Sequence, residues 1–254
     1  MAQKKWSRDE LILAFNLYCK TPFGRIHTHN HDIIELAEKI GRTPSAVSWK
    51  LANFASLDPA LKERQIVGAT HASKLDAEIW EEFNQNWELS GYESEKLFAN
   101  TMGKPIEVEP ETDLPDLPDG KERETFIRAR VNQSFFRKAV LAAYDFRCCI
   151  TGLNLPELLN ASHIIPWSVD VQNRLNPKNG LCLNAILDRA FDRGLMTITT
   201  AFRVKVSPTL KNTTSDTAIQ ELLIRYDDLP IRLPTRFRPS SEFLSYHNNY
   251  IFRI

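Results

Sequence analysis

The chain has 254 residues, and its 32 basic and 32 acidic side chains give a formal net charge of zero. At 43% hydrophobic residues, it has an ordinary globular composition and enough length for two domains. No run approaches eighteen apolar residues, and the start, MAQKKWSRDE, lacks the apolar segment of a signal peptide. These features argue against membrane-spanning and secreted classes, and we expect a cytoplasmic protein.

Charge is unevenly distributed along the chain. The balance of Lys and Arg over Asp and Glu is +4 in residues 1–75, −11 in residues 76–122 and +7 in residues 123–254. The segment 103–122, GKPIEVEPETDLPDLPDGKE, holds four prolines and no sustained apolar period, as is typical of an extended linker. We therefore predict an α+β protein with a helical domain at 1–102, a linker at 103–122 and a second domain at 123–254. The basic ends are compatible with contact to a phosphate backbone, although solvated charge alone can give such differences.

The first predicted helix opens after Trp6, with Ser7 as its cap and Leu11, Ala14, Phe15 and Tyr18 on one apolar face. A second helix is expected from about Asp32 to Ile40, where Gly41 stops it. A third begins with Thr43 as its cap and Pro44 in its first turn.

Two short helices joined by a turn that contains glycine form a candidate helix-turn-helix or winged-helix-like unit. The phrase GRTPSAVSWKLANF resembles the recognition half of such DNA-binding domains. In that interpretation the third helix enters the major groove, and Val47, Leu51 and Phe54 pack inward. The residues expected to be exposed and to read DNA are Ser45, Ser48, Trp49, Lys50 and Asn53. A plain packing unit of two helices is the alternative.

Residues 75–100 predict a helical hairpin. Its aromatic residues, Trp80, Phe83 and Trp87, are expected in the core, whereas Glu78, Glu81 and Glu82 form a solvated face.

The second half of the chain carries a pattern with clear chemical meaning. His163 lies in an apolar run at 158–167, which predicts a strand ended by Pro166. An Asn179-Gly180 turn follows, with a positive φ expected there. After it, Leu183, Ile186, Leu187, Ala190 and Phe191 follow helical spacing, while Asn184, Asp188 and Asp192 form a polar stripe.

This combination suits the hydrolysis of a phosphodiester. Such a reaction needs a group that takes a proton from water and a cation that holds the scissile phosphate. The imidazole of His163 titrates near neutral pH, and the carboxylate of Asp188 is a hard ligand for Mg²⁺. On its own, a histidine in an apolar run is more often a packed core residue than a catalyst.

Four ordered motifs resemble the HNH endonucleases of bacterial restriction systems. They are Cys149-Ile150-Thr151-Gly152, Ser162-His163-Ile164-Ile165-Pro166-Trp167, Asn179-Gly180-Leu181 and Phe191-Asp192-Arg193-Gly194-Leu195. The resemblance implies a ββα-metal fold, in which a two-stranded ribbon packs on one helix around a single metal ion.

By position, the resemblance implies that His163 is the general base, that Asn179 braces the metal loop and that Asp188 is the third letter of an H-N-D motif. It also implies a divalent metal, Mg²⁺ or Mn²⁺, and double-stranded DNA as substrate. Ser162 takes the place of an acidic ligand found in many members and is the weaker candidate beside Asp188, because adjacent strand residues point to opposite faces. Asp192 and Asp170 are the next candidates for the metal.

Several alternatives remain open from the sequence. Leu187 stands where relatives often have a histidine at or next to the third position, so a DNA-binding regulator with an inactive nuclease fold competes with an active restriction nuclease. A protein-interaction adaptor is a third hypothesis. Dependence on a modified base and a homodimer for double-strand cutting are further open points. Asp192 and Arg193 read more simply as a solvated helix end, with Gly194 as the stop.

The rest of the sequence predicts short strands at 195–199 and 203–206 and a C-terminal helix in which His247 is structural. The four cysteines, Cys19, Cys148, Cys149 and Cys182, contain no C-x-x-C pair and are expected as buried free thiols rather than zinc ligands.

Overall fold

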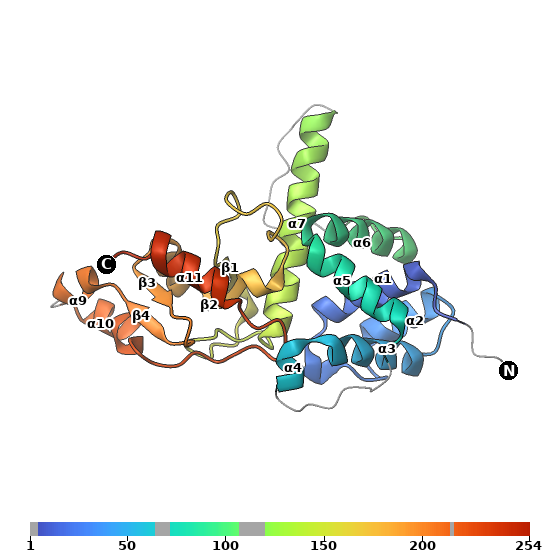
Figure 1. Ribbon diagram of the computed structural model, residues 1–254, viewed down its shortest axis with the longest axis horizontal. Coiled ribbons are helices and arrows are strands. Elements are labelled where there is room, and N and C mark those ends of the chain that lie inside the picture. Colours follow the sequence, from blue (N-terminus) through green and yellow to red (C-terminus); the bar gives the residue numbers. More distant parts are fainter. Residues whose placement is uncertain (1–4, 64–71, 107–119, 214–215) are drawn as a thin grey trace.

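A computed structural model describes residues 5–63, 72–106, 120–213 and 216–254. Its elements form an α+β arrangement in which helices come first and two small antiparallel ribbons follow (Figure 1). The helices of the first half are α1 (Arg8–Lys20), α2 (His31–Lys39), α3 (Pro44–Leu57), α4 (Pro59–Glu63), α5 (Lys74–Gln85) and α6 (Trp87–Met102). The second half contains α7 (Lys121–Ala143), β1 (Leu159–His163), β2 (Gly180–Asn184), α8 (Ala185–Asp192), β3 (Met196–Ile198), β4 (Val204–Val206), α9 (Pro208–Thr213), α10 (Thr217–Leu222) and α11 (Ser241–Tyr250).

Local capping chemistry sets the ends of the first helices, as the sequence predicts. Ser7 and Glu10 form a reciprocal capping box at the start of α1. The Thr43 side chain accepts the Ala46 amide at the start of α3, with Pro44 in the first turn. Gly41 has a φ of 66°, which ends the preceding α2 without the steric cost of a side chain. These expectations are confirmed.

The predicted pair of helices is present as α2 and α3, which pack against each other. Val47, Leu51 and Phe54 of α3 are buried, as expected. No strand occurs among the described residues up to 106, so that part of the chain has no wing beside the helix pair. The expected helical hairpin is also present, as α5 and α6.

An aromatic cluster holds this helical part together. The ring of Phe15 lies 5.0 Å from that of Phe54, 5.7 Å from that of Trp80 and 4.4 Å from that of Phe83. Trp80 stacks on Phe237 from the far end of the chain, with ring centroids 6.1 Å apart. The aromatic residues predicted for the core are therefore in it, and the cluster already includes part of the second half of the sequence.

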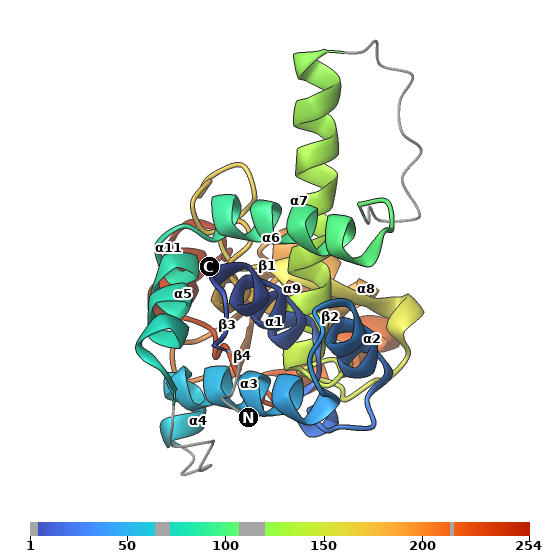
Figure 2. The same cartoon turned by 90° about the vertical axis from the view of Figure 1, so that its right-hand side faces the viewer.

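Helix α7 joins the two halves. Its first turns project from the molecule, whereas its second half runs through the middle (Figures 1 and 2). It packs against α1 and α6 on one side and against β1 and β2 on the other. One continuous hydrophobic core thus extends across both halves. Of the expected linker, residues 107–119 lie outside the described part, and α7 already begins at Lys121, inside the linker range.

The ribbon and helix that carry the HNH-like motifs follow α7. Strands β1 and β2 pair antiparallel, with Ser162 opposite Leu181 and His163 opposite Gly180. The expected positive φ at the Asn-Gly turn is wrong, because Gly180 is extended, with a φ of −127°. Its missing side chain serves close packing instead, since an added Cβ would overlap the side chain of Val140 on α7. Asn184 ends β2 and caps α8 by accepting the Ile186 and Leu187 amides.

The C-terminal elements close one side of this unit. The predicted strands are present as β3 and β4, and α11 is the predicted terminal helix. Gly194 has a φ of 67° after α8, and an added Cβ would overlap the backbone oxygen of Ile251. The predicted stop at Gly194 is confirmed, and it also lets the C-terminal segment approach α8.

Two further sequence expectations concern cysteines and membrane spans. All four cysteines are buried free thiols. Within the described ranges, none of the helices combines the length and the apolar character needed to cross a bilayer.

Candidate active site

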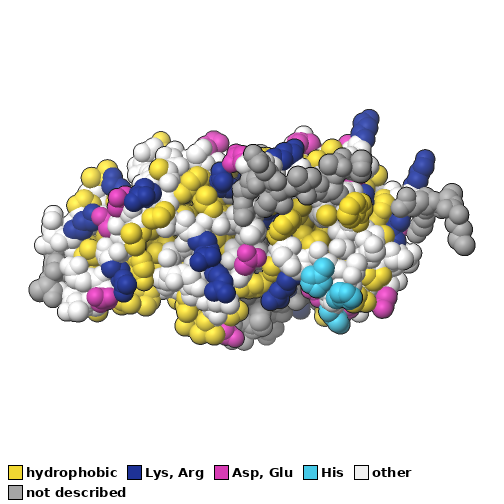
Figure 3. All heavy atoms as spheres, turned by 90° about the horizontal axis from the view of Figure 1, so that it is seen from below, with side chains coloured by type: hydrophobic (Ala, Val, Ile, Leu, Met, Phe, Trp, Pro, Cys, Tyr) yellow, Lys and Arg dark blue, Asp and Glu magenta, His cyan; other side chains and the backbone are white. Residues whose placement is uncertain are grey.

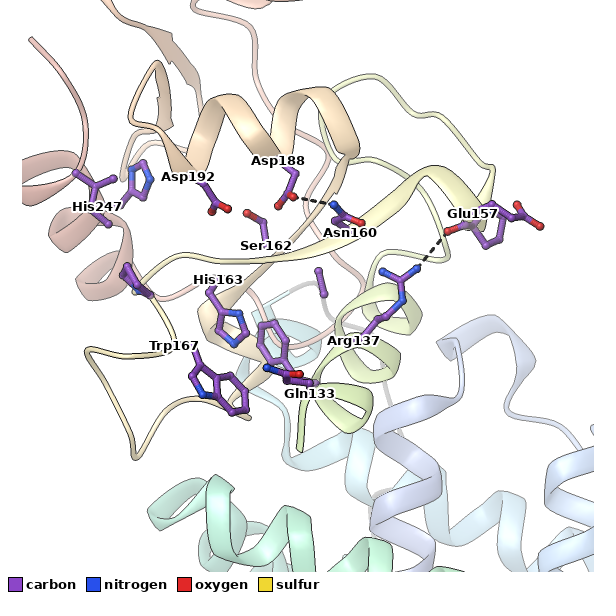
Figure 4. Close-up of a pocket in the computed structure, with 15 residues that line it drawn as sticks. Gln133, Arg137, Glu157, Asn160, Ser162, His163, Trp167, Asp188, Asp192 and His247 are labelled. Atoms are coloured by element: carbon purple, nitrogen blue, oxygen red, sulfur yellow. Dashed lines mark hydrogen bonds between the residues drawn. The ribbon is translucent and has the colours of Figure 1, made fainter. Parts of the chain in front are cut away.

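A cleft of about 910 Å³ lies where α7, β1, α8 and α11 meet. His163 and Ser162 come from β1, and Asp188 and Asp192 come from α8 (Figure 4). The remaining residues that line it are Gln133, Phe136, Arg137, Pro156, Glu157, Asn160, Ala161, Pro166, Trp167, His247 and Ile251. The fold therefore brings the expected base and the expected metal ligand into one cavity.

The His163 ring is held on three sides. It stacks on Phe136 of α7, with centroids 3.8 Å apart and planes inclined by 14°. Trp167 meets it edge-on at 5.5 Å. Its Nε2 lies 2.9 Å from the carbonyl oxygen of Arg174. These contacts fix the orientation of the ring relative to the cleft.

The buried position of the His163 ring also determines its protonation state. Burial lowers the pKa of His163 to about 4, while the Arg174 carbonyl and the nearby Asp188 carboxylate act in the opposite direction. The imidazole is therefore neutral at pH 7. Because a carbonyl oxygen only accepts hydrogen bonds, Nε2 must carry the proton of the neutral ring, which leaves Nδ1 as the basic nitrogen.

Asn179 braces the loop between the two strands but does not line the cleft. Its Oδ1 accepts the Ile165 amide at 2.8 Å, and its Nδ2 donates to the carbonyl oxygens of Ile165 at 3.1 Å and Asn173 at 3.4 Å. The geometry favours a positioning role for Asn179 over contact with the substrate. The bracing function that the resemblance implies is compatible with these bonds.

A layer of oxygen-bearing side chains lies between β1 and α8. Asn160 donates from Nδ2 to Oδ2 of Asp188 at 2.7 Å. Ser162 stands two residues further on the same strand face, is 2% exposed and has no hydrogen-bond partner for its Oγ. Asp192, one turn after Asp188, has its pKa raised by burial and by the neighbouring Asp188 carboxylate. In Figure 4 the side chains of Asp188, Asp192 and Ser162 point toward one another.

This layer fits a hard divalent cation. Two carboxylates that repel each other and an unsatisfied buried hydroxyl would all be stabilised by positive charge, and oxygen donors suit Mg²⁺ or Mn²⁺. The described residues of the cleft do not bring three His, Cys, Asp or Glu ligand atoms within 4.8 Å of one another. Water or phosphate oxygens would therefore have to complete the coordination of the ion.

One group of described residues does bring three such ligand atoms within 4.8 Å of one another, but it lies outside the cleft. It consists of His31, Asp32 and Glu35 at the surface of α2, where Glu35 is paired with Lys104 at 2.6 Å. Histidine side chains gather at one place on the face seen in Figure 3. The group of His31, Asp32 and Glu35 does not line the cleft.

Arg137 supplies positive charge to the cleft from α7. Its Nη1 donates to the Leu159 carbonyl at 2.7 Å, and its Nη2 donates to the Pro156 carbonyl at 3.3 Å. These bonds fix the guanidinium at the edge of β1.

His247 is structural, as the sequence predicts, although it also borders the cleft. Its ring stacks on Phe191 at 3.7 Å, its Nδ1 lies 2.8 Å from Thr197 Oγ1, and its Nε2 lies 3.2 Å from the Phe191 carbonyl. Burial lowers its pKa to about 4.

We expect this burial to make the protein sensitive to acid. The unfolded chain binds a proton at His247 near pH 6.5, whereas the folded chain resists it down to about 4. The stabilisation is thus complete above about pH 6.5 and is lost as the pH falls toward 4, by on the order of 3 kcal/mol. Urea unfolding from pH 7 to pH 4 measures this loss. His247→Gln should reduce the slope in that window, and an unchanged slope would contradict the assignment.

The structure corrects two of the expected DNA-reading residues. Lys50 is 7% exposed, and its ammonium is paired with Asp76 of α5 at 2.9 Å. Asn53 is also buried. In this structure neither side chain can reach a base edge, because α5 packs against this side of α3 and covers it. Ser45 is exposed, Ser48 is half-buried and Trp49 is 60% exposed, so these three remain candidates.

Several site residues were missed in the sequence. Asn160 was detectable, since strand alternation places it on the same face as Ser162. Asp192 was favoured as a solvated helix end and named only as a reserve candidate for the metal, but it lines the cleft. Phe136, Arg137 and Ile251 lie far away in the sequence, and no local pattern marks them. Asp170 is hydrogen-bonded to Asn173 within the loop and does not line the cleft.

Comparison with curated proteins finds no match for the chain. Residues 148–199, about a fifth of its length, match the family model described as HNH endonuclease. The matched segment contains β1, β2, α8 and β3, and with them His163, Asn179 and Asp188. The HNH endonuclease match thus coincides with the ribbon and helix that form the cleft, and it points to nuclease activity there.

Proposed function

We propose that the chain is a metal-dependent DNA endonuclease of the restriction or defence type. The observation that carries this proposal is the cleft that a neutral, oriented His163 lines together with the carboxylates of Asp188 and Asp192. The match of residues 148–199 to the HNH endonuclease family supports the same chemistry.

In the proposed reaction, Nδ1 of His163 takes a proton from the attacking water. The resulting imidazolium is stabilised by the Arg174 carbonyl on the opposite nitrogen and by the nearby carboxylate of Asp188. Arg137 holds phosphate oxygens at the edge of β1. A pKa near 4 makes the base weak but keeps it unprotonated over the physiological range.

HNH nucleases generally require a divalent metal ion, and here Asp188, Asp192 and Ser162 would hold it. When bound, the ion supplies positive charge for the scissile phosphate and the leaving oxygen. The Asn160 side chain would orient Asp188 for this role by donating a hydrogen bond to its Oδ2.

Plasmid DNA incubated with the protein and Mg²⁺ or Mn²⁺ tests the proposal. Nicked or linear products that disappear on chelation are expected. Substrates from hosts with different methylation would reveal dependence on a modified base, and linear product without nicked intermediates would favour a homodimer that cuts both strands. Intact plasmid under all these conditions would reject the activity.

Trp49 is the best remaining candidate for DNA contact by the helix pair. Trp49→Ala is expected to weaken duplex binding by about 1–3 kcal/mol, because a contact to a base is lost. Electrophoretic mobility shifts with the full chain measure it, with Leu89→Ala on α6 as an exposed apolar control. Equal affinity of Trp49→Ala and the unaltered chain would make α2 and α3 a packing unit.

The second candidate function is a DNA-binding regulator with an inactive nuclease fold. Leu187 of α8 is buried and offers no ligand, and the described residues of the cleft do not bring three His, Cys, Asp or Glu ligand atoms close together. This alternative predicts salt-dependent DNA binding without cleavage in any metal.

A further inference from the structure

A short stretch before β2, residues 174–179, contacts both the candidate base and the helical half of the chain. Arg174 contacts the base, since its carbonyl oxygen lies 2.9 Å from Nε2 of His163. The next residue, Leu175, is fully buried and packs on Gly91 of α6. Two consecutive residues of one backbone segment therefore meet the proposed base and a helix of the other half.

The contact at Gly91 has the form of a notch in α6. A Cβ added to Gly91 would lie 2.6 Å from Cδ2 of Leu175 and 3.7 Å from ring atoms of Phe135 on α7. The first distance is shorter than a real Cβ atom keeps from a neighbour, so the leucine occupies the space that a larger residue would need. Glycine weakens the interior of a helix relative to alanine, and this close approach explains its place in the middle of α6.

Backbone geometry links the notch to the base. The carbonyl oxygen of Arg174 and the Cα atom of Leu175 belong to one peptide unit, which is planar and resists deformation. A displacement of Leu175 at the notch therefore moves or tilts the carbonyl that binds His163. The stretch is also fixed further on, where Lys178 Nζ donates to Oδ1 of Asn84 on α5 at 3.4 Å. Both anchoring points thus belong to the hairpin of α5 and α6.

We propose that Leu175 is a positioning residue for His163, and that the notch at Gly91 makes the helical half part of the apparatus that orients the base; its catalytic consequence rests on the proposed endonuclease function. The leucine fixes the plane of the peptide that carries the Arg174 carbonyl. That carbonyl holds the Nε2 proton of the neutral ring and so directs Nδ1. Because proton transfer depends strongly on geometry, a displaced ring lowers the rate of reaction and not the affinity for DNA.

The test fills the notch and then restores the original volume, in the full chain. Gly91→Ala favours the helix by itself, and Leu175 is fully buried, with no open space into which to turn. The single-turnover rate of cleavage at saturating metal is expected to fall roughly 10- to 100-fold, as for a misplaced reacting group, with duplex affinity nearly unchanged. Gly91→Ala with Leu175→Val adds one carbon atom and removes one, and is expected to recover most of the rate.

A second readout does not depend on cleavage. In a ¹⁵N NMR spectrum, the ring N–H signal of His163 reports its hydrogen bond to the loop carbonyl. In Gly91→Ala this signal is expected to shift and to exchange faster with water, and the volume-restored variant is expected to return it. His247, whose Nε2 also lies beside a carbonyl oxygen, is the internal control and should keep its signal in every variant.

Leu36→Ala on α2 is the matched control, because it removes an equally buried leucine from a helix that packs on α3 and α6. It should leave the cleavage rate and the His163 signal unchanged, whereas Leu175→Ala should alter both. The original signal or the original rate in folded Gly91→Ala or Leu175→Ala would overturn the positioning role, as would a volume-restored variant no faster than Gly91→Ala. An unaltered chain that cleaves nothing would reject the nuclease function, while the ring signals would still decide whether Leu175 holds the carbonyl in place.

Discussion

Replacement of His163 by alanine is expected to lower the rate of DNA cleavage on the order of 10²- to 10⁴-fold, because proton transfer from water loses its acceptor. The neutral ring, with Nε2 bonded to the Arg174 carbonyl, is oriented for this task. Single-turnover cleavage of a labelled duplex at saturating metal gives the rate. Duplex affinity with Ca²⁺ is expected to change little, since phosphate contacts come from other side chains.

Loss of the ring also removes the stack on Phe136, so folding must be measured beside activity. His29→Ala, an exposed histidine before α2, is the matched control and should leave cleavage unchanged. Added imidazole can enter the space left in His163→Ala and is expected to restore part of the rate. A variant that is folded, binds DNA and cleaves at the original rate would remove His163 from the mechanism.

The helix ends and the ribbon-helix unit were predictable because their causes are local. Ser7 and Glu10 are three residues apart and cap each other, and Asn184 caps α8 through its own neighbours. The order of strand, strand and helix follows from short-range spacing as well. Two residues on that unit, His163 and Asp188, therefore line one cleft.

The errors share one physical origin, which is contact between segments far apart in the sequence. Lys50 stands at a position that helical spacing alone leaves at the edge of the apolar face, and only the arrival of Asp76 on α5 buries it. Gly180 is a glycine because Val140 of α7 lies against it, not because a turn needs a positive φ. Neither neighbour can be recognised from a local pattern.

The relation between the two halves illustrates the same limit. A proline-rich acidic segment predicts separate domains, yet Arg236 near the C-terminus is fully buried and donates to the Cys19 carbonyl of α1 at 2.9 Å. Leu175, in the loop between β1 and β2, packs on Gly91 of α6. A Cβ added at Gly91 would lie 2.6 Å from Cδ2 of Leu175. The helical half thus supports the loop that orients the base, and the boundary at 102 remains a prediction.

The second large effect is expected at Asp188. Asp188→Asn keeps the shape of the side chain and an oxygen that can accept from Asn160, but it removes the negative charge that would bind the ion. We expect cleavage at low Mg²⁺ to fall at least about 100-fold, since loss of a direct ligand should exceed the 10- to 100-fold effect typical of its hydrogen-bonding partners. Mn²⁺ binding by calorimetry gives the same quantity without any cleavage.

The pattern across three variants distinguishes a metal site from a structural bond. If Asp188 holds the ion, high Mg²⁺ should partly restore Asp188→Asn, Asp192→Asn should show a smaller defect of the same kind, and Asn160→Ala should weaken metal binding by about 10- to 100-fold. Glu221→Gln, an exposed acid paired with Arg225 on the surface, is the control and should show no change. Asp188→Asn with unaltered Mn²⁺ affinity would place the ion elsewhere. Because the Asp188 carboxylate also raises the pKa of His163, a loss of cleavage that no metal concentration restores, at unaltered Mn²⁺ affinity, would instead assign this carboxylate to stabilising the imidazolium formed during the reaction.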